Sequence, residues 1–160
     1  MFEIHTDPTL PKAQAYAELA ASAKALVSGE PDAIANMANL AALVWMSVPG
    51  LNWAGFYRVI EGELVLGPFI GKPACIRIPL GQGVCGTAAA TGATQLVPDV
   101  HQFPGHIACD AQSRSELVVP VIVEGTVRAV IDLDSPELNR FDSADATGIE
   151  NLAAIVAAFL

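Results

Sequence analysis

Two pairs of strand-like segments, each joined by a Glu-Gly dipeptide, constrain the fold of this chain more than any other feature. From Leu51 the apolar residues recur with a period of two, and NWAGFYRVI is followed by ELVLGPFI, with Glu61-Gly62 between them. Further along, LVVPVIV and TVRAVIDLDS flank Glu124-Gly125. Runs of this length separated by a short turn that contains glycine are typical of β-hairpins. The sequence therefore predicts two antiparallel hairpins.

The segments around these hairpins have helical spacing. Helices are expected from about Pro8 to Val27, where Ser28-Gly29 follows, and from Pro31 to about Ser47. The other expected elements are a strand at 76–78, a helix at about 84–91, a strand at 94–97 and a last helix capped by Asp142 or Ser143. This order predicts one α+β domain over residues 1–160, with a central antiparallel sheet and helices packed mainly on one side.

The charge balance limits the partners of the chain. Eight Lys and Arg residues face 17 Asp and Glu residues, so the formal net charge is −9, with too few cations to neutralise nucleic-acid phosphates. A solvated acidic surface is the simpler interpretation than a basic macromolecular partner. The N-terminus MFEIHTDPTLPK does not resemble a signal peptide, and runs such as LAALVWM are too short to span a membrane. We expect a soluble cytoplasmic protein without a nucleic-acid or membrane partner.

One of the three cysteines lies in a loop-like segment, HQFPGHIACDAQSRSE, at residues 101–116. Cys109 has Asp110 beside it and His106 three residues before it, and an apolar strand follows. Reactive groups are commonly held on loops that a core strand anchors. A cysteine used for packing would more often lie inside an apolar run. We therefore expect Cys109 to be a nucleophile.

The other two cysteines also lie in loops rich in glycine and proline. Arg77 near Cys75 and a helix start near Cys85 could both favour the thiolate; alternatively, either cysteine could be a small buried hydrophobe. Three cysteines in a reducing compartment do not make a static disulfide framework. Zinc ligands usually come as close pairs, and His101 or His106 with single cysteines does not supply them, so no metal is predicted.

Three carboxylates are expected to meet near the Cys109 loop. Asp132 and Asp134 are two residues apart on a strand, and so point to the same face at about 6–7 Å. Glu116 opens the strand that should pair with theirs. If the three converge, their repulsion raises at least one pKa and keeps a proton available for general acid catalysis. Such a cluster would bind an ammonium group; the alternative is a solvated strand end.

Trp53 and Tyr57 are four residues apart on the first long strand, an even number, and therefore share a face. They could wall a pocket for a small apolar or cationic group. Core packing is an equal alternative for Trp53.

Four segments together resemble a known enzyme family. NWAGFY, ACIRIPLGQGVCGTAA, HIACDAQSRSELVVP and IDLDSPELNRFD closely resemble the free methionine-(R)-sulfoxide reductases, which have a GAF fold. The resemblance spans roughly residues 52–142, and the flanking helices fit the fold. It implies that Cys109 is the catalytic cysteine, Cys75 the main resolving cysteine and Cys85 an additional or alternative one. It also implies five substrate-binding residues: Glu116, Asp132, Asp134, Trp53 and Tyr57.

The activity implied by the resemblance is reduction of free L-methionine-(R)-sulfoxide. Cys109 would attack the sulfoxide sulfur and become a sulfenic acid, which a second thiol converts to a disulfide and thioredoxin then reduces. The resemblance further implies a homodimer, and no metal or organic cofactor is required. Two alternatives remain: a GAF-type ligand-binding or redox-sensing module, and a thiol peroxidase. Nearby carboxylates would raise the pKa of Cys109, and the role of His106 is left open.

Overall fold

The computed structural model describes residues 9–107 and 110–160. Its helices are α1 (Lys12–Val27), α2 (Ala33–Ser47), α3 (Gly83–Thr91), α4 (Ser143–Ala157) and the short 3-10 helix η1 (Val100–Gln102). Its strands are β1 (Trp53–Ile60), β2 (Glu63–Gly71), β3 (Arg77–Pro79), β4 (Gln95–Val97), β5 (Ser115–Val123) and β6 (Thr126–Ser135). The elements expected from the sequence are all present, and η1 is an addition.

The strands form one six-stranded sheet in the order β3-β2-β1-β6-β5-β4. Every strand pair among the described residues is antiparallel. The two expected hairpins, β1–β2 and β5–β6, lie side by side because β1 pairs with β6, which places Trp53 opposite Asp134. The prediction of a central antiparallel sheet is confirmed.

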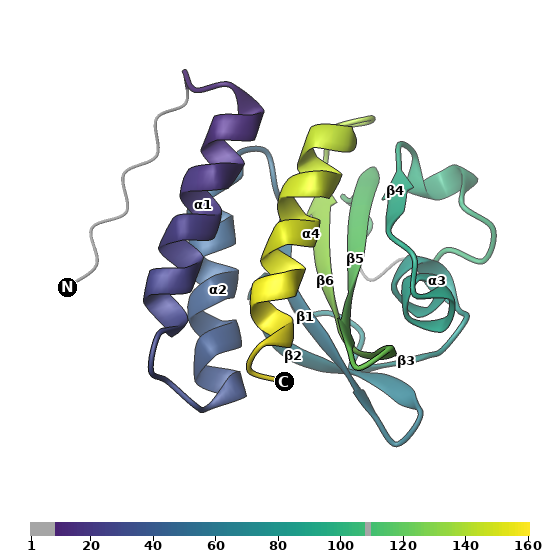
Figure 1. Cartoon of the computed structure of the whole chain (residues 1–160). Helices are drawn as coiled ribbons and strands as arrows, with labels where there is room; N and C mark the ends of the chain where they lie inside the picture. The colour runs from purple at the N-terminus through teal and green to yellow at the C-terminus, as the bar shows by residue number, and fades with distance from the viewer. Residues whose placement is uncertain (1–8, 108–109) are drawn as a thin grey trace.

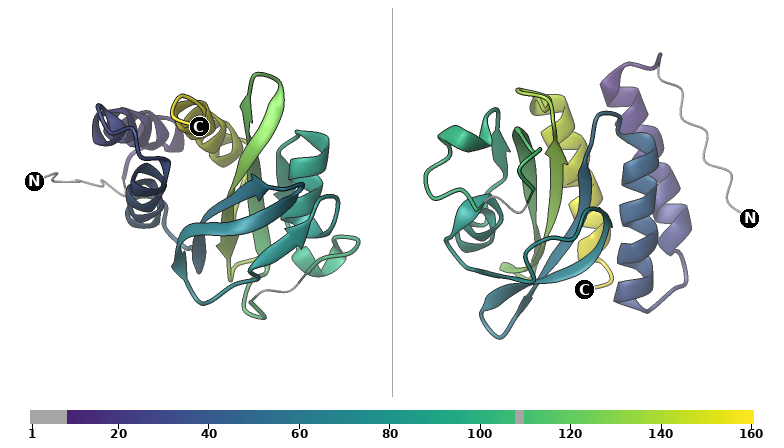
Figure 2. Two further views of the ribbon diagram at one scale, coloured as in Figure 1. Left: turned by 90° about the horizontal axis from the view of Figure 1, so that it is seen from below. Right: turned by 180° about the vertical axis from the view of Figure 1, so that it is seen from behind.

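Helices α1, α2 and α4 cover one face of the sheet, and α3 lies against the other (Figures 1 and 2). The strands alternate accordingly. Phe56, Leu117 and Ile131 point into the larger core under the three helices, whereas Tyr57 and Val118 point into a smaller core under α3. Packing mainly on one side is therefore confirmed, and the exception, α3, encloses the second face. Within the described part of the chain, every helix falls short of the length and apolar character that a bilayer crossing requires.

Local sequence sets the ends of the helices. Helix α1 begins at Lys12 rather than near Pro8, because Pro11 disfavours helical geometry in the residue before it and itself has an extended conformation. The C-terminal helix α4 has Asp142 as its N-cap, as expected. The Asp142 side chain accepts hydrogen bonds from the Ala144 and Asp145 amides, and the Asp145 carboxylate in turn accepts one from the Asp142 amide. This reciprocal capping fixes the helix start.

Candidate active site

A small cavity lies between α3 and the sheet, in the second core. Six of the residues singled out from the sequence line it: Trp53, Tyr57, Cys85, Glu116, Asp132 and Asp134. The cavity has a volume of about 30 Å³, which is room for roughly two water molecules. Its wall is therefore part aromatic, part acidic, with one thiol.

The three carboxylates converge because of the strand register. Glu116 on β5 pairs with Asp134 on β6, and Asp132 lies two residues along the same strand, on the same face. Glu116 and Asp132 are each only 6% exposed. Burial raises the pKa of all three carboxyl groups, and the charge of Asp132 raises those of Glu116 and Asp134 further. For Asp132 the pKa rises to about 7. The cluster therefore retains at least one proton near neutral pH.

The aromatic wall is built on β1. The Trp53 ring stacks on Tyr57 at 5.8 Å and on Phe69 at 5.2 Å between centroids. Gly55 permits this arrangement, because a Cβ atom there would lie 2.4 Å from Cβ of Phe69. Trp53 belongs to the buried core as well as to the cavity wall, so the two interpretations of this residue both hold.

The two aromatic side chains also hold the segment that follows β2. The Trp53 indole N–H donates to the Lys72 carbonyl at 3.2 Å, and the Tyr57 hydroxyl donates to the Cys75 carbonyl at 3.0 Å. The backbone around Cys75 is thereby fixed beside the cavity. Burial raises the pKa of Tyr57, and the neighbouring carboxylates raise it further, so this hydroxyl stays protonated and serves as a donor.

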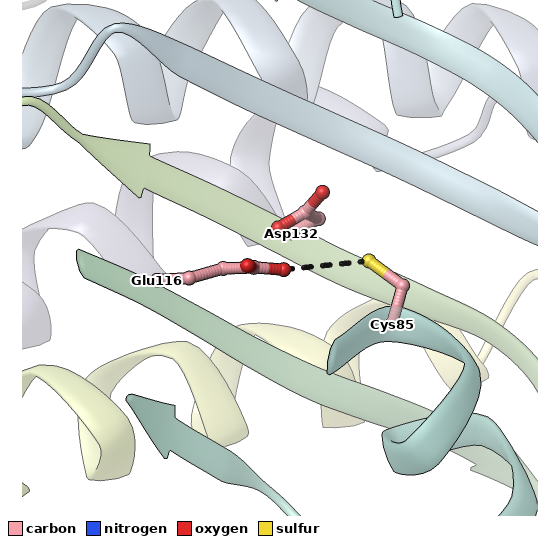
Figure 3. A group of neighbouring side chains, drawn as sticks. All are labelled: Cys85, Glu116 and Asp132. Atoms are coloured by element: carbon pink, nitrogen blue, oxygen red, sulfur yellow. Dashed lines mark hydrogen bonds between the residues drawn. The ribbon is translucent and has the colours of Figure 1, made fainter. Parts of the chain in front are cut away.

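Cys85 is in the first turn of α3, and its side chain points to the carboxylates. Its Sγ lies 3.9 Å from Oε1 of Glu116 (Figure 3), and the residue is 4% exposed. Burial raises the pKa of this thiol well above its usual range, and the charges of Asp132 and Glu116 raise it further. The expectation that the helix start favours a thiolate here is therefore wrong, because desolvation and two carboxylates outweigh the helix terminus.

The other two cysteines differ from Cys85. Cys75 is disulfide-bonded, whereas Cys85 is a free thiol. Arg77, expected near Cys75, makes an ion pair with Glu63 instead. Cys109, expected to be the nucleophile, lies outside the described residues.

His106 reaches the acidic side of the cavity. Its Nε2 lies 4.0 Å from Oε2 of Glu116. Burial lowers the pKa of His106, and the charge of His101 lowers it further, so the ring is neutral near pH 7. As a neutral imidazole it can donate to or accept from a carboxyl group.

A polar network at the rim was not predicted from the sequence. The Asn52 side-chain amide donates to Asp110 at 3.2 Å and to Ser113 at 3.0 Å. Across the opening, the Lys72 ammonium donates to Gln112 at 2.6 Å and to Asp110 at 3.4 Å. The sequence feature that could have pointed to Asp110 is its position next to Cys109, the expected nucleophile.

This fold and site define a GAF domain, and comparisons with known proteins agree. The profile of the GAF domain family matches residues 40–160. The chain is 48% identical to the free methionine-R-sulfoxide reductase of Escherichia coli over 89% of this chain and 87% of that protein. It is 42% identical to the Saccharomyces cerevisiae enzyme of the same name, over 96% and 89%. The X-ray structure of the Neisseria meningitidis free methionine-R-sulfoxide reductase in complex with its substrate superposes with a TM-score of 0.95 at 43% identity, covering 99% of this chain and 95% of that one.

The chain belongs to the family of GAF-fold free methionine-R-sulfoxide reductases. The resemblance inferred from its four motifs is confirmed.

Proposed function

We propose that this chain reduces free L-methionine-(R)-sulfoxide to L-methionine by thiol chemistry. The observation that carries the proposal is the buried cluster of Glu116, Asp132 and Asp134 beside a thiol and two aromatic rings. The relatives named above act on this substrate class by name. A stand-alone ligand sensor has no need of an acid that remains protonated at neutral pH.

The carboxyl cluster suits both ends of the substrate. An ionised member pairs with the substrate ammonium group, and a protonated member donates a hydrogen bond to the sulfoxide oxygen. Protonation makes the sulfoxide sulfur electrophilic, and the raised pKa of Asp132, about 7, matches that of a general acid at neutral pH. The cavity of about 30 Å³ is smaller than an amino acid, so binding requires the rim to move.

The thiol steps follow from the three cysteines. Cys109 attacks the sulfoxide sulfur to form a sulfur–sulfur bond; the protonated sulfoxide oxygen then passes to Cys109 as that bond breaks, so that methionine leaves and Cys109 becomes a sulfenic acid. Cys75 condenses with it, which releases water and forms a disulfide that thioredoxin reduces. The disulfide state of Cys75 and the burial of Cys85 support Cys75 as the resolving thiol. A homodimer remains a prediction.

The test is turnover of the separate epimers. The chain is incubated with free methionine (R)-sulfoxide, or with the (S) epimer, and with either dithiothreitol or thioredoxin; the methionine formed is then quantified. We expect turnover of the R form and its loss in Cys109→Ser, whereas Glu150→Gln, an exposed change on α4, serves as the control. No turnover of the R form would refute the function, and peroxide consumption without sulfoxide turnover would indicate a thiol peroxidase.

A further inference from the structure

Three metal-binding side chains meet in the cavity from three separate elements. Cys85 comes from α3, Glu116 from β5 and Asp132 from β6 (Figure 3). The sulfur and one oxygen of each carboxyl group all lie within 4.8 Å of one another, and all three residues are buried. Its members are separated by 31 and 16 residues rather than by the short spacing of a zinc motif, so the spacing alone does not indicate a metal site.

One atom of this group lacks a partner. Asp132 Oδ1 is buried and has no hydrogen-bond partner among the described residues. A buried carboxylate oxygen without a partner is destabilising, by about 1–3 kcal/mol in mutational series. The oxygen belongs to a residue that lines the cavity. A bound ligand with positive charge would supply the missing interaction.

The cluster has little compensation for its negative charge. Of the salt bridges within residues 9–107 and 110–160, the one that reaches these three residues comes from His106, whose Nε2 lies 4.0 Å from Oε2 of Glu116. A cation entering the cavity would therefore meet acidic groups that no lysine or arginine of the described chain neutralises.

The donor set selects zinc among common divalent ions. A thiolate disfavours magnesium and calcium, whereas a mixture of sulfur, carboxylate and imidazole suits Zn²⁺. In a tetrahedral site with zinc bonds of about 2.0–2.3 Å, neighbouring ligand atoms lie about 3.5 Å apart. The distance from Cys85 Sγ to Glu116 Oε1 is 3.9 Å, so small side-chain rotations close the site. The cavity of about 30 Å³ has room for one ion, and a water molecule can complete its coordination.

We propose that Cys85, Glu116 and Asp132 form a zinc-binding site, and that a bound Zn²⁺ excludes the sulfoxide substrate from the same cavity. The metal is an inhibitor and not a cofactor. The binding statement is independent of the proposed function, whereas the exclusion of substrate rests on it.

The test uses the full-length chain with Co²⁺ as a spectroscopic probe. Since the chain has three cysteines, a Cys75→Ser, Cys109→Ser double variant keeps Cys85 as its one thiol. We expect Co²⁺ to give a sulfur-to-cobalt charge-transfer band in this variant, and Zn²⁺ to remove the band by displacement. Absence of the band in the double variant would overturn the proposal, as would a band that survives when Cys85→Ser is added.

Carboxylate variants test the rest of the site without removing the thiol. Asp132→Asn and Glu116→Gln keep the shape of each side chain, and each should weaken Zn²⁺ binding by about 100-fold. Loss of a residue that only hydrogen-bonds to a metal ligand weakens binding by about 10–100-fold, so loss of a ligand itself should have at least the larger of these effects. Glu150→Gln, on the opposite side of the sheet, should leave the affinity within about twofold. Binding unaffected by either cluster variant would place the metal elsewhere and refute the site.

The final measurement separates the two proposals. In an active chain, Zn²⁺ should raise the KM for the free R sulfoxide and leave kcat unchanged; inhibition that excess substrate does not relieve would overturn the shared cavity. A chain that shows the cobalt band but reduces no sulfoxide would refute the proposed function and leave the metal site standing. An active chain without the cobalt band would refute the metal site and leave the proposed function standing.

Discussion

At the scale of single residues, the most unusual feature is a set of acidic groups in a place that favours none of them. Asp132 is 6% exposed, its Oδ1 has no hydrogen-bond partner among the described residues, and it lies diagonally across the strand pair from Glu116. Burial raises the pKa of all three carboxyl groups, and the charge of Asp132 raises those of Glu116 and Asp134 further, because the groups share a poorly solvated space. Such an arrangement reduces stability, and proteins retain it mainly at functional sites.

Asp132→Asn should therefore make the protein more stable and less active. The amide is neutral, keeps the shape of the side chain and can donate to Glu116, so at pH 8 the free energy of unfolding should rise by about 1–3 kcal/mol. Turnover of the R sulfoxide should fall by about 10²–10⁴-fold, the usual effect of losing a general acid. Urea unfolding and a methionine assay measure the two effects. Glu150→Gln should change stability by less than about 0.5 kcal/mol; an Asp132→Asn protein that is less stable at pH 8, or fully active, would contradict this account.

The sequence predicted that these carboxylates meet, but not the register that brings them together. With Glu124-Gly125 as the turn, regular pairing would place Glu116 opposite Leu133; a bulge between Val121 and Ile122 shifts the register by one residue, so that Glu116 pairs with Asp134 and Asp132 shares their face. The state of Cys85 could not be predicted in the same way. A helix start favours the thiolate, and only the packing of α3 against the sheet shows that two carboxylates and burial oppose it.

At the scale of elements, the contact between α1 and α4 depends on a glycine. Gly148 lies in the middle of α4, and a Cβ atom there would lie 2.1 Å from the Tyr16 ring of α1. Burial of that ring brings its hydroxyl to Asp145, with an O–O distance of 2.8 Å. The helices pack closely because one of them has no side chain at the contact.

Gly148→Ala should destabilise the protein, although the same change in most helices stabilises them by up to about 1 kcal/mol. Here the added methyl group would force Tyr16 to move, and overpacking of this kind costs about 1–3 kcal/mol. Thr147→Ala, the exposed neighbour, should change the free energy of unfolding by less than about 0.5 kcal/mol. Thermal or urea unfolding of the two variants compares them directly. Equal stability of Gly148→Ala and the parent would show that Tyr16 has free space in solution.

Which elements form could be predicted from the sequence, but their packing could not. The period of two in β1, β2, β5 and β6 and the helical spacing of α1, α2 and α4 come from local patterns. The separation of α3 from the other helices has no local signal, because its nine residues are small and mostly apolar, and its two threonines do not define a polar face. The cavity exists only because α3 lies on the second face, so its position, its volume and the rim network of Asn52 and Lys72 had to come from the structure.

At the scale of the whole molecule, two sets of carboxyl groups change the free energy of unfolding in opposite directions as the pH rises. Hydrogen bonds from Lys12 and from backbone amides lower the pKa of Asp142 to about 2. The stability that Asp142 contributes is present above the pKa of 3.8 that it has in the unfolded chain, and is lost as the pH falls towards 2. Glu116, Asp132 and Asp134 have raised pKa values. The stability that these three groups contribute is fully present below the pKa values of 3.8–4.5 that they have in the unfolded chain. It is lost as the pH rises through their pKa values in the folded protein.

The buried cluster should dominate this balance, since Asp142 is exposed and screened by solvent while three groups shift together in the cavity. The free energy of unfolding should therefore be highest near about pH 4–5 and should decrease towards pH 8, by up to about 1.4 kcal/mol per pH unit for each titrating group. Urea unfolding at intervals of one pH unit measures the profile. Asp132→Asn should flatten it between about pH 4 and 7, the interval between the unfolded pKa of 3.8 and the folded pKa of about 7 for that carboxyl group. A parent protein whose stability rises from pH 5 to 8 would show that the three carboxyl groups ionise without penalty, and the acid proposed for the sulfoxide oxygen would then be absent at neutral pH.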